Sequence, residues 1–309
     1  MEIDAIATAH AKRLSVADAL LPTPPNWDAA AGTELSVRDG VALATRSRVD
    51  AGSPEALWRP LTEYRLNVRL GGADPGAAFG ALLTEWDQLL EESEASDWDS
   101  AAVVTRPSRD TVGTSELLRR GFAPTRVLAV RPADRLAGGP PEVPGVRIRH
   151  AEPSELNTLV RLQLELRNYD EQFGVLTRRT DEERALTSAT RELLADADSA
   201  LPSLWIAELY GKPLGFVQVE VPPAAGWADS YVAAGSAGYL ASMHVAEEAR
   251  SSGVGSALAA HAHQLFDEAG MQAVLLHHTL ANPRSTPFWY AQGYRPLWTS
   301  WYRRPAVQG

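Results

Sequence analysis

The clearest periodic pattern in the chain lies in its second half. Residues 146–149 alternate in polarity, and apolar stretches at 204–208, 214–219, 239–245, 273–278 and 297–302 are typical of strands. Start signals and spacing predict helices over 153–166, 180–194, 253–269 and 286–292. Gly211 and Lys212 mark a hairpin turn. The predicted order is β-α-α-β-β-β-α-β-α-β.

The first half repeats the end of this order. Gly121-Phe122-Ala123-Pro124 corresponds to Gly293-Tyr294-Arg295-Pro296, a separation of 293 − 121 = 172 residues. A predicted hairpin at 35–43, with its turn at Asp39-Gly40, corresponds to the hairpin around Gly211. Residues 1–21 look helical, without a counterpart of the strand at 146–149. The pattern therefore predicts an α/β (α+β) fold of two related domains in tandem, each with a mixed, twisted sheet flanked by helices.

A stretch rich in Pro and Gly separates the two copies. Residues 132–144 include Gly138-Gly139-Pro140-Pro141, and neither a strand nor a helix persists through such a segment. We therefore expect a first domain over residues 1–135, a linker over 136–145 and a second domain over 146–309.

Composition narrows the class of protein. Apolar residues make up 45% and charged residues 22% of the 309 residues, which is ordinary for a soluble globular protein. We expect a cytoplasmic protein without a membrane partner, since no apolar run approaches ~18 residues and the N-terminus lacks a signal-peptide pattern. Cysteine is absent, and we expect no metal site. The net charge of −10 argues against a nucleic-acid partner and mildly favours a cationic substrate, although solubility is the more common reason for an acidic surface.

One loop between a predicted strand and a predicted helix has the features of an anion site. The strand ends at Val245, and the helix begins at Gly253 and Gly255, where the absence of Cβ atoms lets an anion approach the N–H groups of the first turn. Arg250 adds a cation. A dinucleotide fingerprint is disfavoured because Leu258 replaces the third Gly, and no Lys forms a phosphate loop of the Walker type. A plain helix start remains an alternative for the loop taken alone.

With its neighbours, this loop resembles the GNAT family of N-acetyltransferases. The family motif is a strand followed by R/Q-x-x-G-x-G/A and a helix, and the spacing from Val245 through Arg250 to Gly255 matches, although Glu247 replaces a frequent Pro. Asn282 and the segment Phe288-Trp289-Tyr290-Ala291-Gln292-Gly293-Tyr294 match the family's late motif. The resemblance covers about residues 146–303.

The resemblance implies a site for acetyl-CoA as cosubstrate. Main-chain groups at Met243, His244 and Val245 should pair with the pantetheine arm, between strands that splay apart to admit the thioester. The loop should hold the pyrophosphate, and the remaining cofactor-binding candidates are Arg250, Ser251, Ser252, Gly253, Val254, Gly255, Ser256 and Asn282.

The first half lacks residues of the kind that would bind the cofactor in the second half. With the helices aligned at a separation of 257 − 81 = 176, Arg250 falls on Asp74, Gly253 on Ala77 and Gly255 on Phe79, so that an acid and a bulky ring stand where phosphate would bind. We expect a degenerate domain without cofactor. It would complete the acceptor site or replace a second subunit, in a protein that is a monomer or a homodimer.

The catalytic residues are less defined. The family often has Glu at the position of Tyr239 and Tyr at the position of Trp289. Tyr290 is a candidate acid or a core residue, and Tyr239 could position a water. His277 and His278 lie on the strand that lines the expected cleft, and since successive strand residues face opposite ways, one of them should point toward it; His277 is the candidate base.

The expected function is transfer of an acetyl group to a primary amine of a small molecule or peptide by direct attack. The acidic pair Asp170 and Glu171 could receive this amine or end a solvated helix. A non-catalytic acyl-CoA sensor is the alternative.

Overall fold

A computed structural model describes residues 3–93, 97–132, 143–174, 176–195, 201 and 203–307. The chain divides into two compact units. Unit 1 comprises Met1–Ala51, Trp58–Val127 and Pro296–Gly309, and unit 2 comprises Gly52–Leu57 and Leu128–Arg295. Most of the expected linker, residues 136–142, lies outside the described residues.

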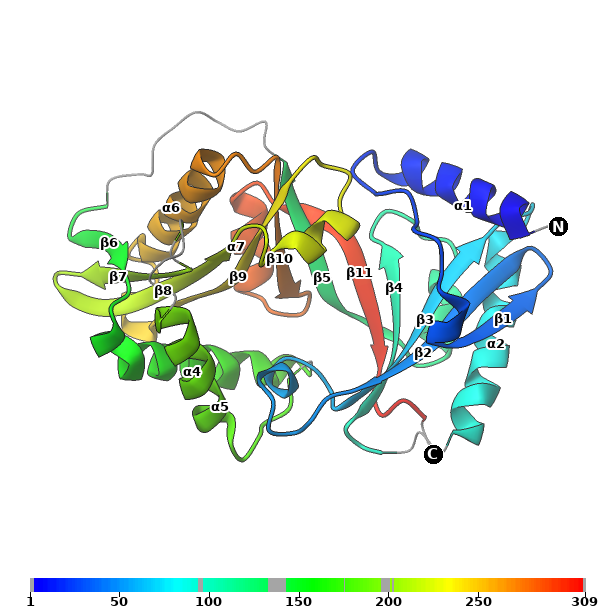
Figure 1. Cartoon of the computed structure of the whole chain (residues 1–309), viewed down its shortest axis with the longest axis horizontal. Helices are drawn as coiled ribbons and strands as arrows, with labels where there is room; N and C mark the ends of the chain where they lie inside the picture. Colours follow the sequence, from blue (N-terminus) through cyan, green and yellow to red (C-terminus); the bar gives the residue numbers. More distant parts are fainter. Residues whose placement is uncertain are drawn as a thin grey trace. The chain divides into compact units, whose positions relative to one another are not determined.

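Unit 1 contains a mixed sheet with strand order β1-β2-β3-β4-β11. Its elements are α1 (Ile3–Ala17), β1 (Thr33–Val37), β2 (Gly40–Arg48), β3 (Thr62–Leu70), α2 (Pro75–Glu92), β4 (Ser100–Pro107), α3 (Thr114–Arg119) and β11 (Arg295–Arg303). Helix α2 lies against this sheet (Figure 1). Its apolar stripe buries Phe79, Leu82 and Trp86. Burial of these side chains forms the core of unit 1.

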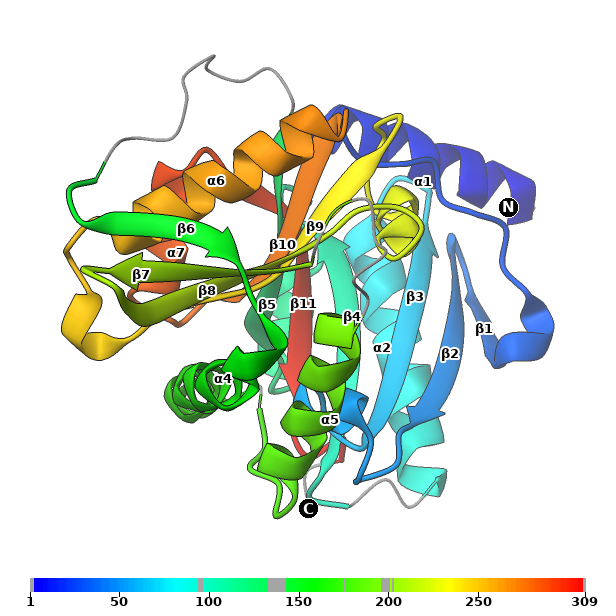
Figure 2. The same ribbon diagram turned by 60° about the vertical axis from the view of Figure 1, so that its left-hand side comes forward.

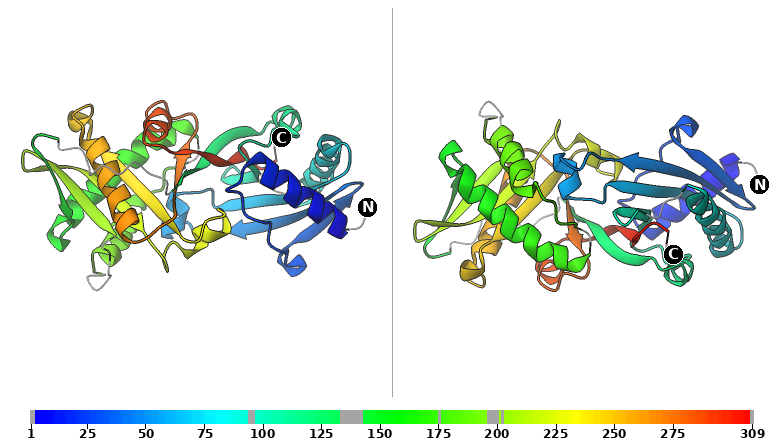
Figure 3. Two further views of the ribbon diagram at one scale, coloured as in Figure 1. Left: turned by 90° about the horizontal axis from the view of Figure 1, so that it is seen from above. Right: turned by 90° about the horizontal axis from the view of Figure 1, so that it is seen from below.

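Unit 2 contains a sheet with strand order β5-β10-β9-β8-β7-β6. Its strands are β5 (Ala123–Pro132), β6 (Val146–His150), β7 (Leu204–Leu209), β8 (Lys212–Glu220), β9 (Ala237–Val245) and β10 (Ala273–Thr279). Its helices are α4 (Leu156–Asp170), α5 (Glu182–Ala195), α6 (Val254–Glu268) and α7 (Ser285–Ala291), with short 3₁₀ turns η2 (Pro54–Leu57), η5 (Gly226–Ser230) and η6 (Glu247–Ala249). Figure 3 shows α6 over one face of the sheet and α4 and α5 over the other. Among the described residues, no helix combines the length and apolarity needed to cross a membrane.

The predicted order of elements in the second half is confirmed, from β6 through α4, α5 and β7 to β11. The element order also repeats within the chain, since β1-β2-β3-α2-β4-α3 has the same order as β7-β8-β9-α6-β10-α7. Both hairpins turn where the sequence predicts. Asp39 has φ 66° in the first, and Tyr210 and Gly211 have φ 51° and 80° in the second.

The two halves of the sequence exchange pieces between the units. The last strand of the chain, β11, pairs antiparallel with β4 and so completes the sheet of unit 1. In turn, residues 128–132 of β5 lie beside β10 in the sheet of unit 2. The segment Gly52–Leu57, between β2 and β3 in the sequence, also belongs to unit 2. Each compact unit is therefore built from both halves of the chain.

Candidate functional site

Strands β9 and β10 separate part of the way along their length. Their parallel register runs from Ala237 and Ala273 to Leu240 and Leu276 and ends there, whereas β9 continues to Val245. β8 pairs with β9 beyond this point, and the register shifts so that β9 holds one extra residue, Ala241. A bulge bends the strand that carries it. Figure 2 shows β9 and β10 side by side, and because their pairing ends at Leu240 and Leu276, the edge of β9 from residue 241 onward is open, with no pairing to β10.

The loop after β9 delivers the N-terminus of α6 next to this opened edge. Ser251 and Gly253 have φ 62° and 88°, and no side chain caps the helix at Gly253. The first α-helical bond recorded here runs from Ala257 N to Gly253 O at 3.0 Å. The preceding first-turn N–H groups have no partner within a helix, and the helix dipole adds partial positive charge. This end of α6 therefore favours an anion.

The two glycines of the loop differ in the space they leave for a side chain. A Cβ at Gly253 would lie 2.9 Å from Cγ1 of Val143, and the positive φ already disfavours other residues. At Gly255 a Cβ would lie 3.5 Å from Phe288, which is ordinary contact. Arg250 adds a half-buried cation whose Nε lies 3.4 Å from the carbonyl oxygen of Val245. A pyrophosphate on the loop and an extended amide chain along β9 fit these residues.

Asn282 connects the late motif to helix α4. Its Nδ2 donates to Oδ1 of Asp170 at 3.0 Å, and its Oδ1 accepts from the N–H groups of Arg284 and Ser285, each at 3.0 Å. The side chain is 4% exposed. Asn282 thus holds the start of α7 by contacts within the protein. Asp170 already has this amide as a partner, and Glu171 pairs with Arg178 at 2.7 Å.

In unit 1 the N-terminus of the corresponding helix, α2, is capped by residues of the protein itself. Asp74 accepts a hydrogen bond from Ala77 N at 2.9 Å and caps α2, and Pro75 has no N–H to offer. Phe79 is fully buried beneath Gly113, where a Cβ would lie 2.2 Å from the ring. The protein's own carboxylate therefore occupies the position that would otherwise favour a phosphate.

The opened edge of β3 in unit 1 is also occupied. The parallel register of β3 and β4 ends at Arg65 and Val103, much as that of β9 and β10 ends. At the end of β3, Leu70 N donates to Nδ1 of His10 at 3.3 Å, and Arg13 donates to Leu70 O at 3.3 Å, both from α1. Burial and nearby arginines lower the pKa of His10 to about 3, so that the ring is neutral and accepts this bond. The N-terminal helix takes the main-chain groups that a pantetheine arm would need.

A polar and aromatic cluster lies at the start of β9 in unit 2. The hydroxyl of Tyr239 lies 2.9 Å from Nδ1 of His277 on β10, and Trp227 from η5 packs edge-on against Tyr239 at 4.8 Å between ring centroids. Glu220 is directly opposite Tyr239 in the β8–β9 register. Burial raises the pKa of the Glu220 carboxyl, although a hydrogen bond from Gln218 opposes the shift. The cluster thus contains a phenol, an imidazole and a carboxyl group.

On α7 the two adjacent aromatic residues have different environments. Trp289 is 6% exposed and packs on Tyr294, whereas Tyr290 is 38% exposed. Tyr290 lies edge-on to His278 at 5.6 Å, and burial raises the pKa of its hydroxyl. His278 Nδ1 lies 3.2 Å from the hydroxyl of Thr286, and burial lowers the pKa of this imidazole. Tyr290 is therefore a protonated phenol at the surface rather than part of the core.

His244 and Ser242 follow the cluster along β9. His244 Nε2 lies 3.3 Å from Glu165 on α4, and burial lowers the pKa of the imidazole against the opposing effect of this carboxylate. Its side chain therefore faces α4. The hydroxyl oxygen of Ser242 is buried without a hydrogen-bond partner among the described residues. Ser242 is a donor that can serve a bound group.

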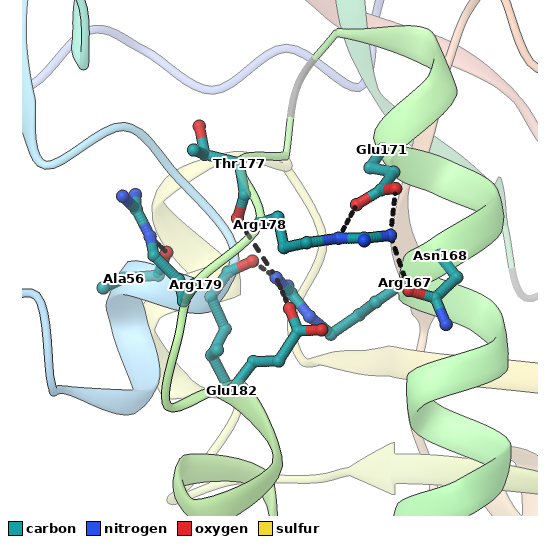
Figure 4. Close-up of polar contacts among 9 residues, drawn as sticks. Ala56, Arg167, Asn168, Glu171, Thr177, Arg178, Arg179 and Glu182 are labelled. Carbon is teal, nitrogen blue, oxygen red and sulfur yellow. Dashed lines mark hydrogen bonds and ion pairs between the residues drawn. The ribbon is translucent and has the colours of Figure 1, made fainter.

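The loop between α4 and α5 is held by the segment Gly52–Leu57 (Figure 4). Arg167, 3% exposed, donates to the carbonyl oxygen of Leu57 and contacts Glu182 at 3.3 Å. Arg179 donates from Nε to Ala56 O at 3.1 Å. Residues of the first half thus order this loop of unit 2.

The sequence profile of the acetyltransferase (GNAT) family matches residues 166–294. This range contains the opened strand pair, the loop and α7. The second half of this chain contains a GNAT domain. No curated protein sequence matches the chain.

Solved GNAT structures are similar to the chain over both halves. A GCN5-related N-acetyltransferase from Sphaerobacter thermophilus is 14% identical, with 88% of this chain and 79% of that chain covered and a TM-score of 0.55. The glucosamine N-acetyltransferase region of a fungal multi-domain GH3 β-N-acetylglucosaminidase is 14% identical, covering 86% of this chain and 31% of that chain at a TM-score of 0.50. A tandem GNAT protein from the clavulanic acid biosynthesis pathway is 16% identical over 87% of this chain and 80% of its own, at 0.48. At these identities the first two structures, with TM-scores of 0.55 and 0.50, show a GNAT fold.

Within the GNAT domain, the structure groups the sequence-predicted residues into separate sets. Tyr239 and His277 meet in the cluster on β9 and β10, whereas Tyr290 contacts His278. Sequence reasoning missed Glu220 and Trp227. The available signal was a carboxylate directly after a predicted apolar strand, but the register that places it opposite Tyr239 requires the structure.

Proposed function

We propose that this protein is an N-acetyltransferase that moves an acetyl group from acetyl-CoA to a primary amine. The observation that supports this most is the uncapped N-terminus of α6 beside the opened edge of β9. One element offers donors for a pyrophosphate, and the other offers main-chain groups for an amide-containing arm.

The roles of the cofactor residues follow from their positions. N–H groups between Ser251 and Ser256 would hold the pyrophosphate, and Arg250 would neutralise part of its charge. Main-chain groups from Met243 to Val245 would orient the pantetheine arm. Asn282 would act indirectly, by fixing the start of α7. Acetyl-CoA, when bound, supplies the reactive thioester.

Residues of the chain would then carry out two proton transfers. Attack by the amine forms a C–N bond and breaks a C–S bond, the amine loses a proton and the thiolate gains one. We assign the first proton to Nε2 of His277, whose Nδ1 lies 2.9 Å from the Tyr239 hydroxyl. We assign the second to the hydroxyl of Tyr290, a phenol that is partly exposed and protonated at neutral pH. The Ser242 hydroxyl would donate to the developing oxyanion.

Unit 1 would take no part in cofactor binding. Asp74 caps α2, and His10 and Arg13 occupy the end of β3. The proposed role of the first half of the sequence is structural, because it supplies the segment Gly52–Leu57 of unit 2, which contacts the α4–α5 loop. A second candidate function is that of a non-catalytic acyl-CoA sensor, favoured by Tyr239 and Trp289 at two positions where the family often has other residues.

Release of free thiol from acetyl-CoA with a panel of amines distinguishes an enzyme from a sensor. The proposal predicts amine-dependent thiol release and an acetylated product by mass spectrometry. His277→Ala and Tyr290→Phe should each lower the rate and alter its dependence on pH, while leaving CoA affinity unchanged. Binding of CoA without turnover of any amine would favour the sensor and overturn the enzymatic proposal.

A further inference from the structure

Glu220 is a partly buried carboxylate that forms no ion pair with a cation among the described residues. Gln218 donates a hydrogen bond to it from Nε2 at 3.1 Å. Burial is the main influence on its pKa, which is raised because water no longer solvates the charge fully. A cation supplied by a ligand would restore the missing interaction.

Aromatic rings surround the strand position that faces Glu220. Glu220 and Tyr239 are opposite each other in an antiparallel pair, so that both side chains lie on one face with Cβ atoms ~4.5–5.5 Å apart. Trp227 packs on Tyr239 at 4.8 Å and stacks on His277 at 6.2 Å with an interplanar angle of 16°. Tyr231 packs on Trp227 at 5.8 Å.

The outer rings of this cluster are accessible. Trp227 and Tyr231 are each 38% exposed, although large aromatic side chains are usually well buried. Trp227 lies in the turn η5 and Tyr231 directly follows it. Asp229 in η5 fixes this turn by accepting a hydrogen bond from Ala237 N at 3.1 Å. Aromatic faces attract ammonium groups within ~6 Å and also bind apolar bodies. Rings and carboxylate together suit a ligand that is cationic at one end and apolar elsewhere.

We propose that Glu220, Trp227, Tyr231 and Tyr239 form the acceptor site, and that they select a primary amine carried on an apolar body without a carboxylate or phosphate. An acidic acceptor would bring a second negative charge beside Glu220, where no cation of the cluster compensates it. The link between this cluster and acetyl transfer depends on the function proposed above. The recognition itself is independent of turnover.

Calorimetric binding to the full chain, without acetyl donor, tests the selection with matched probes. 2-Phenylethylamine has the predicted features, phenylalanine adds a carboxylate, and 2-phenylethanol replaces the amine by a hydroxyl. We expect 2-phenylethylamine to bind at least about tenfold more tightly than either analogue, a difference of ~1.4 kcal/mol. Equal or tighter binding of phenylalanine would overturn the proposal.

Variants assign the selection to the cluster. Glu220→Gln should weaken 2-phenylethylamine by about tenfold or more while leaving 2-phenylethanol unchanged, and Trp227→Ala should weaken both. Glu183→Gln, at an exposed position of α5, is the matched control and should change neither. Unchanged affinity for 2-phenylethylamine in a folded Glu220→Gln variant would refute the role of the carboxylate.

The two proposals fail in different ways. If 2-phenylethylamine binds and depends on Glu220, but acetyl-CoA releases no thiol with any amine, the recognition is supported and the enzymatic function is refuted. If thiol is released with acidic amines such as phenylalanine while 2-phenylethylamine neither binds nor reacts, the enzymatic function is supported and the recognition is refuted.

Discussion

A single charge placed in the α6 loop should separate ligand binding from stability. In Gly255→Asp the new Cβ would lie 3.5 Å from Phe288 and 3.7 Å from Val245, so the backbone has room for it. An acidic side chain in the first turn of a helix stabilises it by ~0.3–1 kcal/mol through the helix dipole. The free energy of unfolding should therefore stay unchanged or rise slightly.

Binding of CoA should change in the opposite direction. Two like charges ~4 Å apart near a protein surface repel by about 4 kcal/mol, which corresponds to roughly a thousandfold loss of affinity. Titration calorimetry with CoA measures this loss, and thermal unfolding measures stability on the same samples. Gly255→Ala is the matched control, because it adds the Cβ without the charge and should retain most of the affinity. CoA affinity in Gly255→Asp equal to that of the wild type would refute the anion role of the loop.

Further predictions concern the rest of the chain. Asp74→Ala removes the cap of α2 and should lower stability by ~1 kcal/mol in denaturant unfolding, with CoA stoichiometry still one per chain; two sites would contradict the closed state of unit 1. Glu220→Gln should be more stable than the wild type near pH 7, because a carboxyl with a raised folded pKa contributes stability at low pH that is lost as pH rises through that pKa. The difference in unfolding free energy between variant and wild type should vanish below the ordinary pKa of Glu. A difference that stays constant with pH would contradict the raised pKa. A fragment of residues 146–309 should lack cooperative unfolding, because unit 2 loses Leu128 and Val130, each worth ~1.5–3 kcal/mol when buried; a folded fragment with full CoA affinity would contradict this dependence.

Local sequence signals predicted most of the secondary structure. Apolar runs bounded by Gly, Pro and Asp define the strands, and the repeat at a separation of 172 residues indicates the second copy. The comparison of Arg250 with Asp74 was informative because the chemistry at a helix N-terminus depends on a few adjacent residues. These features are short-range in the chain and are therefore readable from it.

Long-range pairing could not be predicted in the same way. Nothing in the local pattern of β11 indicates that it pairs with β4 in unit 1, because an apolar strand fits many sheet positions. The insertion of Gly52–Leu57 into unit 2 depends on main-chain carbonyls that accept from Arg167 and Arg179. Carbonyl groups are present at every residue, so such contacts have no sequence signature.

The candidate catalytic residues show the same limit. The strand period left open which of His277 and His278 points toward β9, and the contact with Tyr239 identifies His277. The helix period left Tyr290 between an acid and a core residue, and its exposure of 38% places it outside the core. The sequence predicted the strand or helix that carries each candidate residue. It did not predict which way the side chain of that residue points.

Calorimetric titration of CoA into the wild-type chain is the most direct test of a single acyl-CoA loop in a protein with two related units. The uncapped α6 and the self-capped α2 together predict one molecule of CoA per chain. Two molecules per chain would contradict the closed state of unit 1, and no binding would contradict the assignment of the Arg250–Gly255 loop.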